Sequence, residues 1–195
     1  PELADFQNTK YAQQFTDDIT AVRAVEQSLG SDRSDLSQVA ARMLYKAMAY
    51  KDEYEVARLA LKSDIVGQAK ARFGPNAKVS YQLKPPMLKS AGYDKKIAIP
   101  EVAGRAMFEG LKRTKGMRGK ALDPFGRTEE RRIERQLIDD YRDLLTTLVA
   151  KLNADNYDQA LSIAGLYDMV RGFDDIKLAN VERYRTQLAD ALADY

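Results

Sequence analysis

One long amphipathic helix is predicted by the stretch TEERRIERQLIDDYRDLLTTLVAKL, which runs from Thr128 to Leu152. Thr128 can cap its first turn, and the carboxylates of Glu129 and Glu130 have the charge that the helix dipole favours there. The apolar positions recur every three or four residues, so they share one face. They are Ile133, Leu137, Tyr141, Leu144, Leu148 and Leu152. We expect this face to pack against further helices in a bundle.

The same spacing of apolar residues predicts further helices on both sides of this stretch. They are expected over residues 11–29, from Ser34 or Asp35 to about Leu61, over residues 65–73 and 100–113, from a capping box at Asn156 and Gln159 to Val170, and around residues 181–192. Gly30 and Gly172 stand where helices commonly end. Short connections between the helices favour antiparallel neighbours.

The period of the pattern changes to two in the middle of the chain. Val79, Tyr81 and Leu83 alternate with polar residues, and Ile97 and Ile99 alternate in the same way. This pattern predicts a small antiparallel β-ribbon at about residues 78–84 and 95–99. The predicted fold class is therefore mainly α, a helical bundle-like domain with a small ribbon, organised as a single domain over residues 1–195.

The composition indicates a soluble globular chain with little net charge. Of the 195 residues, 45% are hydrophobic and 31% are charged, which is enough to bury a core and to cover it with polar groups. The 31 basic and 29 acidic residues leave a net charge of +2, so the chain as a whole indicates neither a nucleic-acid nor a membrane partner. No apolar run reaches the length of a membrane-spanning helix or of a secretion signal. We expect a cytoplasmic protein.

The absence of two residue types restricts the chemistry of the chain. It contains no cysteine and no histidine. Iron–sulfur ligation, thiolate zinc, disulfides and Ser-His-Asp triads are thereby excluded. Carboxylates, lysine, tyrosine and hydroxyls remain, and few enzymes are built from these alone.

Three segments are more specific than helical periodicity requires. They are KAMAYKDEYEVARL (46–59), MRGKALDPFGRTEERRIERQLI (117–138) and VRGFDDIK (170–177), with YQLKPPML (81–88) between the first two. In this order they resemble the carboxy-terminal domain of fused indolepyruvate:ferredoxin oxidoreductases, members of the 2-oxoacid:ferredoxin oxidoreductase family. The resemblance spans essentially the whole chain, and the DPFGRTEERRIER run is its most specific part.

The resemblance implies a larger parent enzyme. That parent decarboxylates an aryl 2-oxoacid with thiamine diphosphate and Mg, passes electrons through iron–sulfur clusters to ferredoxin, and forms an acyl-CoA. This chain has no thiamine diphosphate motif and no cysteine, so we expect the cofactors to lie in preceding domains and this chain to hold none. A start at Pro1 fits a fragment excised from the carboxy-terminal end of that parent.

A first candidate site contains paired carboxylates. Asp52 and Glu55 lie three residues apart on one helix face, with Lys51 and Arg58 spaced to pair with Glu55. Two such carboxylates could bind a metal or move a proton. The other interpretation, which we favour, is a solvated face with ion pairs, because no histidine or further acidic cluster supports a metal site.

A second candidate is a basic patch between residues 112 and 135, a range that contains nine basic and four acidic residues. Its candidate interaction residues are Arg118, Lys120, Arg127, Arg131, Arg132 and Arg135. Arginine suits carboxylates or phosphates, so this patch could contact another domain or an acidic ferredoxin. The alternative is that the arginines bridge to carboxylates nearby in the same chain.

The turn Asp123-Pro124-Phe125-Gly126 is interpreted as structural. Proline fixes a turn, glycine permits positive φ, and Phe125 can anchor the loop in a core.

These observations favour a non-catalytic structural and interface domain, whose partners are the preceding domains of the parent polypeptide or neighbouring protomers, and ferredoxin. The alternative is a free-standing helical binding module that uses the basic patch for an acidic protein or nucleic acid. This alternative is the weaker hypothesis, because aromatic residues do not interleave with the basic ones, as single-strand binding would favour. An independent enzyme using tyrosine, lysine and carboxylates is the third hypothesis.

Overall fold

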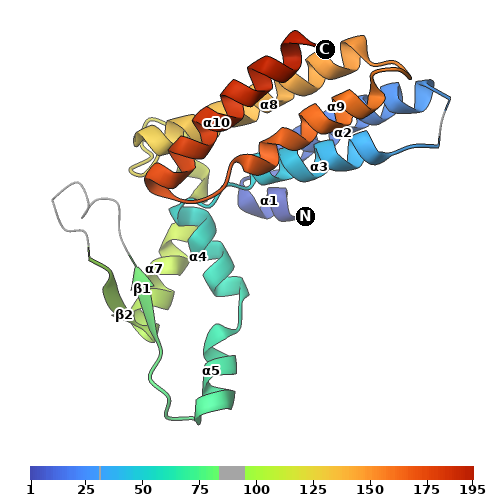
Figure 1. Cartoon of the computed structure of the whole chain (residues 1–195). Helices are drawn as coiled ribbons and strands as arrows, with labels where there is room; N and C mark the ends of the chain where they lie inside the picture. Colours follow the sequence, from blue (N-terminus) through green and yellow to red (C-terminus); the bar gives the residue numbers. More distant parts are fainter. Residues whose placement is uncertain (31, 84–94) are drawn as a thin grey trace. The chain divides into compact units, whose positions relative to one another are not determined.

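The computed structural model describes residues 1–30, 32–83 and 95–195. It is mainly helical with one two-stranded antiparallel sheet, which confirms the predicted fold class (Figure 1). The chain separates into two compact units: unit 1 comprises residues 1–50 and 128–195, and unit 2 comprises residues 51–127. That residues 1–195 form a single domain stays a prediction, because compact units can belong to one cooperative domain or to two.

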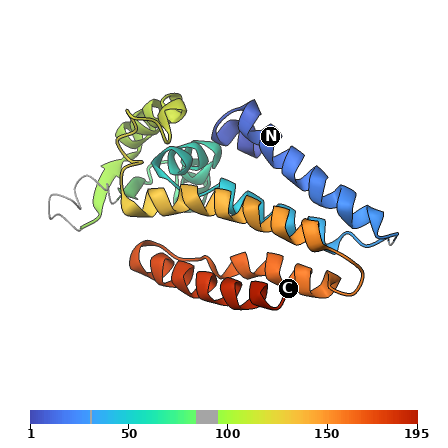
Figure 2. The same cartoon turned by 90° about the horizontal axis from the view of Figure 1, so that it is seen from above.

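Unit 1 is a bundle of long helices that run side by side (Figures 1 and 2). Its elements are α1 (Glu2–Phe6), α2 (Thr9–Ser28), α3 (Asp35–Met48), α8 (Glu129–Lys151), α9 (Tyr157–Gly165), the 3₁₀ turn η2 (Leu166–Met169) and α10 (Asp174–Ala193). Helix α8 packs against α2, α3 and α9, while α10 packs against η2 and α9. The expected packing of the three long helices near residues 11, 34 and 128 is confirmed.

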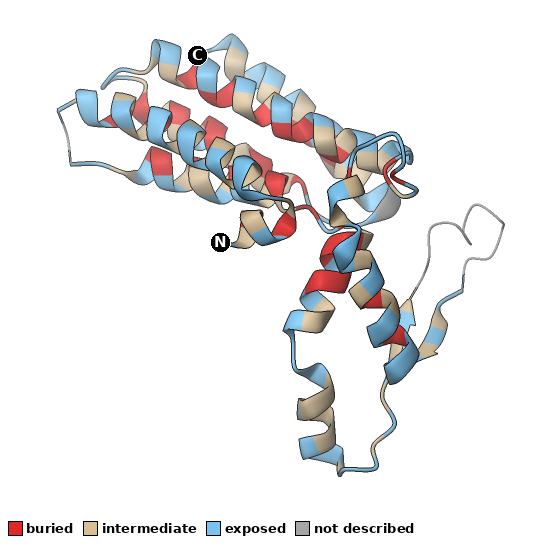
Figure 3. Cartoon of the chain, turned by 180° about the vertical axis from the view of Figure 1, so that it is seen from behind, coloured by how far each residue is buried: buried red, intermediate tan, exposed pale blue. Residues whose placement is uncertain are grey.

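The core of unit 1 lies on the predicted face of α8. Leu137, Tyr141, Leu144 and Leu148 are all at most 3% exposed, and Ile133 and Leu152 at the two ends of the stripe are half-buried. Figure 3 shows the buried positions gathered on one side of the helices in this bundle. Helix α8 therefore buries its apolar face in the bundle, as expected for an amphipathic helix.

The predicted N-terminal cap of α8 agrees with the structure, whereas the predicted cap of α9 does not. Thr128 caps α8 as predicted, accepting from the backbone N–H of Arg131 at 3.3 Å. The predicted capping box at Asn156 is wrong: Asn156 makes no cap hydrogen bond to α9 and instead accepts from the N–H of Asn153 at 2.8 Å. The side chain that would cap the helix is used inside the preceding loop.

The helix expected from residue 34 to about Leu61 is in fact two helices. Helix α3 ends at Met48, and α4 (Glu53–Lys62) begins after Asp52, whose carboxylate accepts from the N–H of Glu55 at 2.8 Å. An aspartate with extended backbone and a capped turn starts a helix rather than continuing one. The predicted start at Ser34 or Asp35 and the predicted end near Leu61 agree with the structure, but the predicted continuity between Met48 and Glu53 is wrong.

Unit 2 combines helices with the ribbon. Its remaining elements are α5 (Ile65–Phe73), β1 (Ser80–Leu83), β2 (Ile97–Pro100), α7 (Glu101–Arg113) and the 3₁₀ turn η1 (Lys115–Met117). Helix α4 packs against α7, and β1 pairs with β2 so that Tyr81 lies opposite Ile99. Residues 78 and 79 precede the observed strand. The predicted strand end at residue 84, and most of the YQLKPPML segment, lie outside the described residues.

Tyr81 fixes the ribbon on α7. Its ring meets the edge of Phe108 at 4.9 Å, and a Cβ at Gly104 would lie only 2.4 Å from a Tyr81 ring carbon. Gly104 is therefore required by close approach, which explains a glycine in the interior of a helix. None of the helices in the described residues combines the length and the apolar character that a membrane crossing requires.

Candidate functional site

In unit 2, the first and second specific segments meet through a buried ion pair. Arg118 donates from Nε to Oδ2 of Asp52 at 2.5 Å and from Nη2 to Oδ1 at 2.9 Å. Both side chains are only 3% exposed. A two-pronged arginine–carboxylate contact of this kind is among the stronger and more directional interactions in proteins. Because Asp52 also caps α4, this one carboxylate joins the start of α4 to the loop that follows η1.

A second buried carboxylate, Asp123, holds the turn of the DPFG segment. It accepts from the hydroxyl of Tyr54 at 3.1 Å, from the N–H of Gly119 at 2.7 Å and from the N–H of Phe125 at 3.0 Å. The ring of Phe125 meets Tyr54 edge-on at 5.4 Å. Phe125 therefore anchors the turn as predicted, and it does so by packing against Tyr54 of the first specific segment.

The environment favours the charged form of Asp123 and the neutral form of Tyr54. Burial acts to raise the pKa of Asp123, but hydrogen bonds from the backbone N–H groups of Gly119, Phe125 and Gly126 outweigh it and leave the pKa below its usual value. Burial, together with the neighbouring Asp123, raises the pKa of the Tyr54 hydroxyl. Tyr54 is thus a hydrogen-bond donor to a carboxylate rather than a titrating acid at neutral pH.

The remaining paired carboxylate is also internal. Glu55 accepts from Nε and Nη2 of Arg58, both at 2.8 Å, and the two residues are 4% and 8% exposed. The prediction of a solvated face is therefore wrong, although the Glu55–Arg58 pair that it included is present. Lys51 is exposed and forms no ion pair with another described residue.

The structure divides the predicted basic patch between the two units. Arg118, Lys120 and Arg127 belong to unit 2, and Arg131, Arg132 and Arg135 belong to α8 of unit 1. Arg118 is buried on Asp52, so the prediction that it contributes to a surface is wrong. Lys120 and Arg127 are exposed, and Arg127 donates to the carbonyl of Ala121 at 2.9 Å.

On α8, part of the patch is engaged by a buried carboxylate. Arg131 binds Glu134 at 2.5 Å, and Lys177 of α10 binds the other oxygen of the same carboxylate. Glu134 is 4% exposed. Lys177 belongs to the VRGFDDIK segment, so this contact ties the third specific segment to the second within unit 1. Arg132 is exposed and Arg135 is half-buried.

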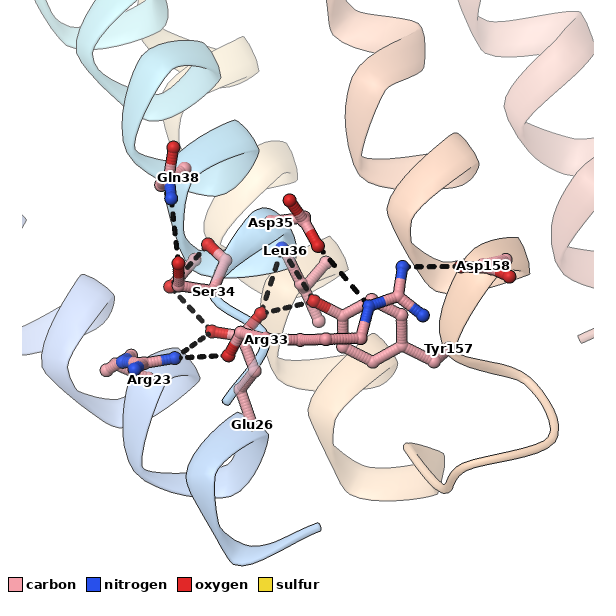
Figure 4. Close-up of polar contacts among 10 residues, drawn as sticks. Arg23, Glu26, Arg33, Ser34, Asp35, Leu36, Gln38, Tyr157 and Asp158 are labelled. Carbon is pink, nitrogen blue, oxygen red and sulfur yellow. Dashed lines mark hydrogen bonds and ion pairs between the residues drawn. The ribbon is translucent and has the colours of Figure 1, made fainter. Parts of the chain in front are cut away.

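Sequence reasoning missed the most completely buried charge of unit 1 in the described residues, Glu26 on α2 (Figure 4). Its carboxylate accepts four hydrogen bonds: from the N–H of Leu36 at 2.9 Å, Ser37 Oγ at 2.6 Å, the Tyr157 hydroxyl at 2.5 Å and Arg23 Nη1 at 3.0 Å. Leu36 and Ser37 lie in the first turn of α3. Glu26 therefore caps α3 from a different helix, where Ser34 makes no cap hydrogen bond of its own.

The partners of Glu26 are held by a second layer of contacts. The guanidinium of Arg33 lies 3.7 Å from the centre of the Tyr157 ring and donates to Asp158 at 2.7 Å. Burial acts to raise the pKa of Glu26, but the hydrogen bonds from Ser37, Tyr157, Arg23 and Leu36 outweigh it and keep the pKa below its usual value. A carboxylate with all of these donors is a structural anion and not a proton donor.

The signal for Glu26 was present in the apolar stripe of its helix. Tyr11, Phe15, Ile19, Val22 and Leu29 form that stripe. Glu26 stands four residues after Val22 and three before Leu29, where the period requires a buried residue. An acid at a buried position needs donors, and the distant Ser37 and Tyr157 supply them.

The donor atoms of this chain do not fit the iron–sulfur cluster that the resemblance implies for the parent. Cysteine is absent from the sequence. Within residues 1–30, 32–83 and 95–195, no group of three or more acidic, cysteine or histidine side chains could hold a metal ion. That the chain holds no cofactor and has no catalytic residue stays a prediction.

The geometry defines a helical protein organised around buried, internally satisfied charges. The chain belongs to the DUF6537 family, described as a family of unknown function, whose model matches residues 1–190. No curated protein and no solved structure matches the chain.

Proposed function

We propose that this chain is a non-catalytic structural and interface domain of an indolepyruvate:ferredoxin oxidoreductase that depends on thiamine diphosphate and iron–sulfur clusters. The observation that supports it best is that the charged residues of the three resembling segments form contacts inside the chain. Their most distinctive charged residues, Asp52, Arg118, Asp123, Glu134 and Lys177, are engaged with one another or with neighbouring groups inside each unit. Groups that are saturated in this way build a scaffold and are not available to a substrate.

The proposal assigns the chemistry to other parts of the parent. Thiamine diphosphate with Mg and the iron–sulfur clusters would lie in preceding domains, since this sequence offers no thiolate ligand. The partners of the chain would be those domains, neighbouring protomers and ferredoxin, in a cytoplasmic enzyme without nucleic-acid or membrane contacts.

Depletion of the native protein from extracts of its source cells tests this proposal. An antibody raised against residues 1–195 should remove both the protein and the indolepyruvate- and CoA-dependent reduction of ferredoxin, whereas a pre-immune antibody should remove neither. Full activity in an extract from which the protein has been removed would contradict the proposal.

The second candidate is a free-standing helical binding module. The observation that favours it is a set of exposed cations in unit 2, among them Lys112, Arg113 and Lys120. The two candidates differ in the depletion experiment, because a free-standing module would leave the oxidoreductase activity in the extract.

A further inference from the structure

The near-neutral chain consists of two oppositely charged units. Unit 2 contains 17 basic and 8 acidic residues, a net charge of +9, and unit 1 contains 14 basic and 21 acidic residues, a net charge of −7. A local charge of this size is sufficient to steer an oppositely charged partner. The chain total of +2 conceals it.

The acidic groups of unit 2 do little to neutralise its surface. Asp52 and Glu55 are buried in ion pairs with Arg118 and Arg58. The other engaged carboxylates are Asp123, which holds the DPFG turn, Asp64, which caps α5 through the N–H of Gly67, and Glu101, which pairs with Lys70. The positive charge of unit 2 is therefore concentrated at its exposed positions.

Helix α7 presents part of this charge on one face. Its buried positions, Gly104 and Phe108, follow the helical period and face the ribbon. Arg105, Lys112 and Arg113 are exposed on the remaining side. They form no ion pair with another described residue, and the same holds for exposed Lys120 in the loop that follows η1.

Two large apolar side chains accompany these cations. Val102 of α7 is 81% exposed, and Leu122 of the following loop is 77% exposed. A single exposed apolar residue is ordinary. Protein interfaces, however, combine a few apolar contacts with a polar and charged rim, and here both apolar residues belong to segments that carry the exposed cations.

We propose that Val102, Arg105, Lys112, Arg113, Lys120 and Leu122, here called the α7 surface, bind an acidic protein surface on which carboxylates surround apolar side chains. Charge complementarity identifies the partner as acidic. The two aliphatic residues favour a protein over nucleic acid, because base stacking uses exposed aromatic rings and Phe108, the aromatic residue of α7, is buried. This inference does not depend on the identity of a parent enzyme.

Binding by the α7 surface has two separable components. The cations determine the association rate and make the affinity fall with rising salt. The aliphatic contacts depend little on salt and provide selectivity for a partner that is acidic and apolar at once. A test must therefore vary charge and apolarity independently.

The test uses the full chain and fluorescein-labelled probes of equal length and equal negative charge, with binding followed by anisotropy at several salt concentrations. One peptide alternates glutamate with leucine, a second alternates glutamate with serine, and a third probe is single-stranded DNA. We expect the glutamate–leucine peptide to bind about tenfold more tightly than the glutamate–serine peptide, which corresponds to the burial of one aliphatic side chain. Equal affinity for the two peptides, or tighter binding of the DNA, overturns the proposal.

Variants assign the binding to this surface. K112E/R113E/K120E should weaken binding of both peptides at least about tenfold at low salt, the range over which steering by charge acts. V102S/L122S should abolish the preference for leucine and retain the salt dependence. The matched control K10E/R42E/R183E changes the net charge equally at exposed positions of unit 1 and should bind like the parent chain.

Folding of each variant is checked by circular dichroism. If K112E/R113E/K120E does not fold, the neutral variant K112Q/R113Q/K120Q replaces it. We expect this variant also to bind both peptides more weakly than the parent chain, with a smaller loss of affinity. An equal loss in the unit 1 control, or no loss in either α7 variant, overturns the assignment to the α7 surface.

Discussion

At the scale of single residues, the chain is organised around carboxylates that are buried and fully hydrogen-bonded. Glu26 is 0% exposed and joins α2 to the first turn of α3 and to Tyr157. Its four donors favour the charged form, so the group contributes more to stability when it is ionised than when it is protonated. Its effect on stability should therefore depend on pH.

The first prediction concerns E26Q, which keeps the size of the side chain and removes its charge. The amide nitrogen would face donors, so we expect the free energy of unfolding at neutral pH to fall by about 1–3 kcal/mol, the cost of leaving buried hydrogen-bonding groups unsatisfied. Urea denaturation followed by circular dichroism measures it. The matched control E182Q changes an exposed carboxylate and should alter stability by less than about 0.5 kcal/mol.

The pH dependence of the same variant gives an independent check. The folded-state pKa of Glu26 is lowered, so its stabilisation is present above the unfolded-state pKa and is lost as pH falls through the folded-state pKa. Wild-type protein should therefore lose more stability on acidification than E26Q does. Parallel pH profiles for the two proteins would show that Glu26 is not a stabilising anion.

The second prediction concerns the Asp52–Arg118 pair in unit 2. R118M keeps the length of the side chain but leaves Asp52 buried without its cation, which should cost about 3–5 kcal/mol. The double variant D52N/R118M should recover part of this loss, because it removes the orphaned charge and keeps a capping residue at position 52. Denaturation curves of the two single variants and the double variant measure the coupling, and additive losses would argue against it.

Sequence reasoning located several of these residues but not their environment. Asp52, Glu55, Arg118 and Asp123 were identified by composition and motif, yet three of them were assigned to exposed positions. Arg118 lies 66 residues from Asp52, and neither residue type is commonly buried. Their pairing depends on the packing of α4 against the loop after η1, which no local pattern encodes.

At the scale of elements, the period of apolar residues accounts for most of the helices. The third prediction is that L137A and L144A each cost about 2–5 kcal/mol, since both side chains are buried in the α8 stripe. I176A, at a position that is 68% exposed, is the control and should lie within about 0.5 kcal/mol of wild type. Losses below that value at both leucines would mean that α8 packs through a different face.

The fourth prediction uses two glycines of the same helix. G104A places a methyl group 2.4 Å from a Tyr81 ring carbon, so we expect a loss of about 1–3 kcal/mol from overpacking. G110A meets nothing within 4 Å and should stabilise α7 by about 0.5–1 kcal/mol, the difference in helix propensity. Thermal unfolding of both variants measures these changes in stability. A change of the same sign in both variants would contradict the close approach of Tyr81 to Gly104.

The elements that the sequence did not predict have identifiable causes. The break between α3 and α4 was missed because apolar residues continue through Tyr50 and Tyr54, although Asp52 and Glu55 already had the spacing of a capping box. Helix α1 was missed because five residues are too few to show a period.

At the scale of the whole molecule, the distribution of charge matters more than its total. The sequence predicted a basic patch from residues 112 to 135, but the division into units at residue 127 separates that range. The opposite charges of the two units become visible only when residues 1–50 are grouped with residues 128–195. This grouping follows from the packing of α2 and α3 on α8, so a linear count could not provide it.

In the proposed function, this chain is the non-catalytic part of a longer cofactor-dependent enzyme. The most direct test is the intact mass and cofactor content of the native polypeptide, purified from its source cells with an antibody against residues 1–195. We expect a polypeptide substantially longer than this chain that carries thiamine diphosphate and iron. A polypeptide with the mass of these 195 residues and neither cofactor would contradict it.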